Sequence, residues 1–92
     1  MRFYDQHLFS TLHIMDNAEQ NILLNIEKVA NKIKQLRKEK GFSSFEAFAN
    51  EYDLDRVQYW RVESGANITL KTFFKILEIH KLSPSDFFKD IS

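Results

Sequence analysis

The chain has 92 residues, enough for one small domain, and its two glycines and one proline leave little material for β turns, so an all-α fold is favoured. It contains no cysteine, which excludes a disulfide framework or a thiolate metal site and agrees with a reducing cytoplasm. The 13 basic and 13 acidic residues give a net charge of zero, which argues against a strong nonspecific nucleic-acid binder, because neutralising phosphates supplies most of such binding.

The N-terminal third predicts an arm followed by a long helix. Asp16 and Glu19 form a capping-box pattern, which places the helix at about residues 17–40. Along it, apolar residues alternate by four and three as in a coiled-coil seam: Ile22, Ile26, Val29, Ile33 and Leu36. The last three are expected to pack on the core of the domain. Upstream, the same spacing joins Leu8, Leu12 and Met15.

Two interpretations of this arm stay open. It either folds back on its own domain or forms a dimerisation arm. The second is favoured, because so small a domain has little spare surface for so many large apolar groups.

Residues 43–65 predict two short helices joined by a tight turn. Ser43 and Glu46 form a second capping-box pattern, so the first of these helices begins near Ser44. Its apolar residues fall at i, i+3, i+4 and i+7, as one stripe: Phe45, Phe48, Ala49 and Tyr52. Asp53 tolerates the left-handed backbone that a tight turn needs.

The second short helix is predicted at about residues 55–64, with Asp55 as its cap and Gly65 as its stop. If Tyr59 and Val62 point inward, the helical period leaves four side chains facing outward: Arg56, Val57, Trp60 and Arg61. A short helix held rigidly by a partner helix is suited to entering the DNA major groove.

The C-terminal third predicts two more helices. The first starts after the cap Thr69 and is apolar on most sides, which favours a central buried helix; its apolar residues are Leu70, Phe73, Phe74, Ile76, Leu77 and Ile79. Ser83, Pro84 and Asp86 give a cap, a first-turn proline and an acidic third position. Three residues are expected to close the core: Phe87, Phe88 and Ile91.

Three segments in order resemble the helix-turn-helix domain of phage lambda-repressor-like regulators, the XRE family. They are IKQLRKEKGFS (33–43), FAxxxxLDRxxYxRVExG (48–65) and ITLKTFFKILEIHKLSPSDFF (68–88). The resemblance implies an all-α, lambda-repressor-like fold of about five helices with an extended N-terminal helix. It divides the chain into residues 1–26, the arm and helix extension for dimerisation, and residues 27–92, the DNA-binding domain.

The chain departs from the family pattern at four points. Ser44 stands where many relatives have glutamine, and Asp53 stands where they have the turn glycine. The segment GFSSFEAFA is one residue longer than usual, and Trp60 replaces a small polar residue.

By resemblance, Arg56, Val57 and Arg61 occupy positions that face base edges. Arginine can pair bidentately with guanine, Val57 can touch a thymine methyl, and Trp60 beside them packs on a sugar or methyl group or is covered by the arm. Phosphate contacts are expected from four residues: Ser44, Ser64, Asn67 and Lys71. In this family the second short helix, at about residues 55–64, is the recognition helix that enters the DNA. The resemblance also implies an ion pair between Arg37 and Glu63 that fixes the angle of this helix.

Catalysis is not expected. His7, His13 and His80 lack the spacing and acidic company of a helical zinc site, and no Gly-rich phosphate loop is present. No metal or cofactor is predicted, and no small-molecule ligand is expected.

The sequence therefore predicts a cytoplasmic transcriptional regulator, by default a repressor, that binds an inverted-repeat operator in double-stranded DNA as a homodimer. Net charge zero and the exposed Trp60 leave one alternative, a helix-turn-helix fold used for protein interaction, as in an antitoxin or adaptor. Arginine-to-alanine substitution at Arg61 separates the two, since only a DNA reader loses affinity unevenly across sequences.

Overall fold

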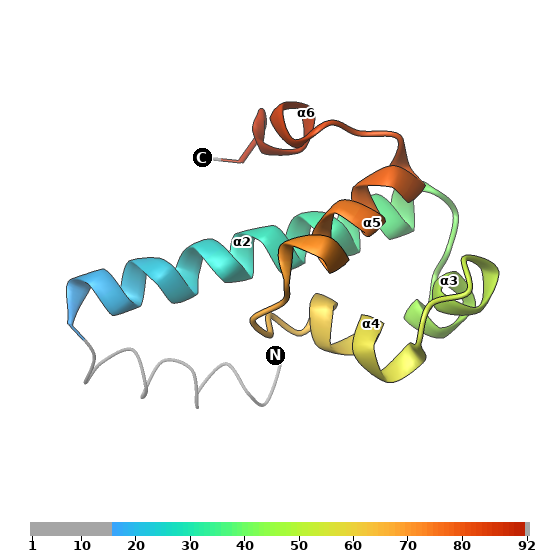
Figure 1. The fold of residues 1–92 in the computed structure, drawn as a ribbon, viewed down its shortest axis with the longest axis horizontal. Coiled ribbons are helices and arrows are strands. Elements are labelled where there is room, and N and C mark those ends of the chain that lie inside the picture. The colour runs from blue at the N-terminus through green and yellow to red at the C-terminus, as the bar shows by residue number, and fades with distance from the viewer. Residues whose placement is uncertain (1–15, 92) are drawn as a thin grey trace.

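A computed structural model describes residues 16–91; residues 1–15 and 92, and with them the predicted arm and the side chains of His7 and His13, lie outside the described residues. Within the described part, the fold is all-α, as predicted. Its five helices are α2 (Asn17–Glu39), α3 (Phe45–Glu51), α4 (Arg56–Glu63), α5 (Leu70–His80) and α6 (Pro84–Phe88). In Figure 1, α2 is the longest helix, and its N-terminal half extends beyond the other four.

One core joins all five helices. The C-terminal half of α2 contributes Ile33, with Val29 and Leu36 packed beside it, as the seam predicts. The residues buried in this cluster come from every element: Ile33, Phe48, Ala49, Tyr59, Val62, Phe73, Ile76, Leu77 and Phe87. Burial of these large apolar groups supplies most of the driving force for folding such a small domain.

Most predicted caps are present. Asp16 accepts a hydrogen bond from the backbone N–H of Glu19 at 2.8 Å, Thr69 caps α5, and Ser83 forms a reciprocal capping box with Asp86. The cap of α3 was predicted one residue too early. Ser44, not Ser43, accepts from the N–H three residues later, that of Ala47, so Glu46 does not complete a capping box.

The prediction of a largely buried α5 is wrong for one of its sides. Phe73, Ile76 and Leu77 are buried, but Leu70 and Phe74 are 69% and 45% exposed. Phe88 was predicted to close the core and is 46% exposed. These three side chains share one face, since a helix places i and i+4 on the same side and α6 continues that side. They border an apolar groove that no other described element fills.

No helix among residues 16–91 is long and apolar enough to cross a membrane.

Candidate nucleic-acid interface

The unit formed by α3, the turn and α4 is held by backbone bonds and ring stacking. Asp53 adopts a left-handed conformation, with φ at 57°, as the sequence predicts. This allows the N–H of Leu54 to reach back to the carbonyl of Ala49 at 2.8 Å, which closes the end of α3. The rings of Phe48 and Tyr59 stack across the two helices, with centroids 5.0 Å apart. The angle between α3 and α4 is therefore set by buried groups.

The recognition helix α4 has two contrasting faces. Tyr59 and Val62 are buried, as predicted. Val57 is 68% and Trp60 51% exposed, and Arg56 and Arg61 are also exposed. The helix starts at the cap Asp55, whose carboxylate accepts from the N–H of Gln58 at 2.8 Å. It ends at Glu63, and Gly65, which has a φ of 87°, turns the chain away two residues later. All four residues expected to meet DNA bases thus lie on the solvent face of one short helix.

A buried ion pair links α2 to the last residue of α4. The Nε of Arg37 donates to Oε2 of Glu63 at 2.8 Å, and a second guanidinium nitrogen donates to Oε1 at 3.0 Å. Both side chains are about 95% buried, with exposures of 5% and 6%. The third nitrogen donates to the carbonyl of Phe42 at 2.8 Å. The pair that the resemblance implies is therefore present, in bidentate form, and the Glu63 carboxylate raises the pKa of Arg37.

Two further polar groups, which the sequence did not single out, belong to rings that stack on Phe48 of α3. The Tyr59 hydroxyl and Nε2 of His80 are buried, and neither has a hydrogen-bond partner among residues 16–91. The His80 ring stacks on Phe48 with a centroid distance of 5.4 Å and an interplanar angle of 9°. Burial lowers the pKa of His80, and nearby Lys40 lowers it further. The signal was available, because His80 follows Ile76 and Leu77 at helical spacing.

The residues predicted to contact phosphates differ in what their polar groups already do. The Ser44 hydroxyl accepts from the Ala47 N–H, and its own hydrogen can still donate outward. The Ser64 hydroxyl already donates to the carbonyl of Trp60 at 2.8 Å, so its hydrogen is engaged. Asn67 and Lys71 are exposed, the first in the loop after α4 and the second on α5.

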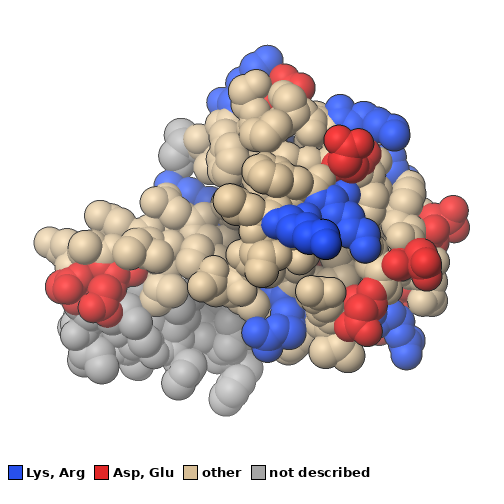
Figure 2. Space-filling model, viewed as in Figure 1, with Lys and Arg blue, Asp and Glu red and all other residues tan. Residues whose placement is uncertain are grey.

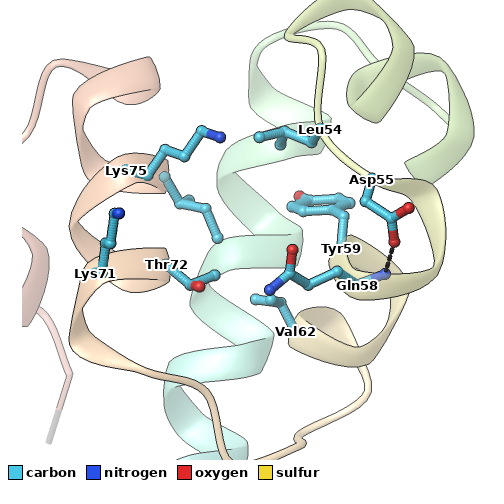
Figure 3. A pocket seen from close by; sticks show the side chains of 9 residues that line it. Leu54, Asp55, Gln58, Tyr59, Val62, Lys71, Thr72 and Lys75 are labelled. Carbon is cyan, nitrogen blue, oxygen red and sulfur yellow. Dashed lines mark hydrogen bonds between the residues drawn. The ribbon is translucent and has the colours of Figure 1, made fainter.

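Lys71 borders a cleft of about 260 Å³ between α4 and α5, together with Lys75 one turn later (Figure 3). In the close-up, both lysines come from α5 and lie across the cleft from Gln58 and Val62 of α4. Lys75 was not among the predicted contacts, although its i+4 spacing from Lys71 places it on the same side of α5.

Figure 2 shows that charge is not concentrated in one basic surface on the face in view. Basic side chains form separate groups there, with acidic side chains between and beside them. Since the net charge is also zero, tight binding to DNA has to come from a few well-placed contacts, not from a broad positive field. Among residues 16–91, no group of three or more His, Asp or Glu side chains is placed to hold a metal ion.

Comparison with known proteins fits this geometry. A helix-turn-helix family model matches residues 33–87, which is more than half of the chain and covers the unit from the end of α2 to α6. A curated relative, described as control protein C.MunI from Mycoplasma sp, is 42% identical over 65 residues, or 70% of this chain and 88% of the relative. No solved structure matches the chain. This chain belongs to the XRE-type helix-turn-helix family and is a DNA-binding transcriptional regulator, not an enzyme.

Proposed function

We propose that the protein is a sequence-specific regulator that binds an inverted-repeat operator as a homodimer, with α4 of each protomer in the major groove. The observation that carries this proposal is the contrast between the two faces of α4. Its buried face is fixed by Tyr59, Val62 and the Arg37–Glu63 pair, and its solvent face carries two arginines. A rigid helix with exposed bidentate donors is the arrangement that direct readout of guanine requires.

In this proposal, Arg56 and Arg61 each pair with the O6 and N7 atoms of a guanine, and Val57 and Trp60 contribute apolar contacts to neighbouring bases. Arginine is suited to this task because its planar fork offers two parallel donors. Arg56 and Arg61 lie five residues apart on one helix, so they address different base pairs.

Phosphate contacts position this helix but do not read the sequence. Ser44 is proposed to donate its hydroxyl hydrogen to a backbone phosphate beside α3, and Lys71 to approach the backbone from α5. Asn67 is proposed to donate from its side-chain amide, in the loop between α4 and α5. Ser64 remains in the set, and its contact requires the hydroxyl to leave the Trp60 carbonyl.

A second copy of the chain is proposed to cover the apolar face that the fold leaves open. The groove between α2, α5 and α6 has a volume of about 320 Å³, and apolar atoms make up nearly all of its lining. Its rim carries Leu70, Phe74 and Phe88, and Ile22, one turn before Ile26 of the lining, continues the exposed apolar surface along α2. A contiguous patch of this kind on a small domain is typical of a protein interface.

Residues 1–26 are proposed to extend this interface, since they continue the apolar spacing of α2. A two-fold dimer presents two recognition helices to half-sites about 34 Å apart, one turn of the double helix. Repression, by occupying a promoter on the cytoplasmic nucleoid, is the proposed mode of action.

The test is selection from a pool of random duplexes with the purified full chain, first at low salt and then at moderate salt. Recovery of a two-fold-symmetric motif that survives the higher salt is the expected result. Its guanines then identify the base pairs that Arg56 and Arg61 read. Weak binding that disappears with salt and yields no motif would overturn the proposal and direct attention to a protein partner.

The dimer is tested separately by sedimentation equilibrium. Phe74→Glu is expected to give a monomer, because a carboxylate in the apolar groove would be desolvated on association. Lys89→Glu, at an exposed residue of the C-terminal end that does not line the groove, is the matched control and should leave the dimer intact. A Phe74→Glu protein that remains dimeric would place the interface elsewhere.

A further inference from the structure

The solvent face of α4 is hollowed next to the start of α3. Five side chains from the two helices line a shallow depression of about 370 Å³: Phe45, Glu46, Arg56, Val57 and Trp60. Its exposed lining is mainly apolar, although the proposed function turns this side of the molecule toward DNA. Val57 is 68% exposed and Trp60 51%. Two large apolar side chains held in water at a polar interface call for an apolar group on the partner.

B-DNA offers few such groups to a helix in the major groove. The bases present hydrogen-bond donors and acceptors at their edges, and the apolar feature among them is the methyl group at C5 of a pyrimidine. We propose that this depression receives the C5-methyl group of a pyrimidine that lies next to a guanine read by Arg56. The inference rests on the proposed function, because it needs α4 to lie in the major groove.

The lining supports a methylated pyrimidine over a sugar as the occupant. Val57 and Trp60 are successive outward positions of α4, three residues apart, so they form a wall that runs along the base edges when the helix lies in the groove. Phe45 closes the depression from α3. The pocket therefore combines two helices whose relative angle is fixed by the buried stack of Phe48 on Tyr59.

Two polar side chains at the rim, Arg56 and Glu46, can form hydrogen bonds that select which methylated base binds. The Arg56 guanidinium can donate to O4 of thymine or to the neighbouring guanine. The Glu46 carboxylate is an acceptor, and it suits the N4 amino group of cytosine, which 5-methylcytosine shares. The common chemistry is a C5-methylpyrimidine, and thymine and 5-methylcytosine are its two sources.

The experiment uses the full chain and the motif recovered by selection. In one arm, each thymine of a half-site is replaced in turn by deoxyuridine, which removes the methyl group and keeps the hydrogen-bonding edge. In the other arm, each cytosine is replaced in turn by 5-methylcytosine. Affinities are measured for the unmodified chain and for a Val57→Ala, Trp60→Ala double variant. Both residues are exposed, so the variant is expected to keep its melting temperature.

We expect one position in each half-site at which the methyl group improves affinity by roughly fourfold, the size expected for burying one methyl group. A loss with deoxyuridine identifies thymine as the source, and a gain with 5-methylcytosine identifies that base. In the double variant the effect of the same methyl group should fall below about twofold, because the wall that contacts it is gone.

Three results would overturn the inference. In the first, the chain binds its motif but no methyl substitution changes affinity by more than about twofold, which removes the methyl pocket and leaves the proposed function in place. In the second, a methyl effect persists in the double variant, which assigns the contact to other residues. In the third, selection recovers no motif, and the proposed function fails together with the pocket.

Discussion

The two faces of α4 differ in what holds their side chains. On the inner face, Tyr59 and Val62 are almost fully buried, and Glu63 is tied to α2 through two hydrogen bonds. On the outer face, Arg56, Val57 and Trp60 are exposed and line a shallow depression. The same eight-residue helix is therefore part of the core and part of the binding surface. Substitutions on the inner face should change stability first, and those on the outer face should change DNA binding alone.

The largest effect is expected at the ion pair. Glu63→Gln leaves the Arg37 guanidinium buried without its carboxylate, which should lower the free energy of unfolding by roughly 3–5 kcal/mol. Urea unfolding followed by circular dichroism measures the change. Glu46→Gln makes the same chemical substitution at an exposed carboxylate and serves as the control. If Glu63→Gln has the same free energy of unfolding and the same melting temperature as the unmodified chain, the ion pair does not fix α4.

The next effect concerns the outer face. Arg61→Ala should cost about 1–3 kcal/mol of DNA-binding free energy, concentrated at one base pair of each half-site. The free energy of unfolding should change by no more than about 0.5 kcal/mol, because the side chain is exposed. Fluorescence anisotropy with single-base variants of the operator measures the first quantity, and urea unfolding measures the second. A uniform loss across all sequences would make Arg61 a phosphate contact instead.

Sequence patterns predicted the inner face of α4 better than the surfaces around it. Helical spacing identified Tyr59 and Val62 as buried, because the apolar residues of a short helix define the face that packs on the core. Asp53 and Gly65 were predicted at the turn and the stop from their backbone preferences, which act locally. The Arg37–Glu63 pair joins residues 26 positions apart, and only the family resemblance pointed to it.

The misses have a common physical cause. Phe88 and the exposed side of α5 were assigned to the core because apolar residues favour burial, but periodicity does not say whether the burying partner belongs to the same chain. The depression next to Phe45 and Glu46 was not predicted either. It depends on how α3 and α4 are juxtaposed, a tertiary feature that spacing along one helix does not contain.

His80, whose ring stacks on Phe48 of α3, makes the stability of the fold depend on pH. Burial and Lys40 lower its folded pKa below the ordinary value of 6.5, and Glu39 opposes this shift. The unfolded chain then binds more protons than the folded one as pH falls below about 6.5, so stability present above that pH is lost on acidification until the folded pKa is reached. The slope should not exceed about 1.4 kcal/mol per pH unit for this single group.

His80→Phe keeps a ring stacked on Phe48 and removes the titrating group. Melting temperatures of both proteins between pH 8 and pH 5 measure the difference. His7 and His13 are present in both, so their contribution cancels. As the pH falls, the melting temperature of the unmodified chain should decrease more than that of His80→Phe. Parallel pH profiles would mean that the folded chain protonates His80 as readily as the unfolded chain does.

The smallest effect tests how well the inner face satisfies its own polar groups. The Tyr59 hydroxyl is buried and has no hydrogen-bond partner within the described part of the chain, and burial together with the Glu63 carboxylate raises the pKa of this phenol. Tyr59→Phe removes the desolvated hydroxyl and keeps the ring on Phe48, so it should leave the free energy of unfolding unchanged or raise it by up to about 1 kcal/mol. Urea unfolding resolves a change of this size when both proteins share one slope. A loss of more than about 1 kcal/mol would show that the hydroxyl donates to Glu63 in solution, which would make Tyr59 a third member of the buried pair.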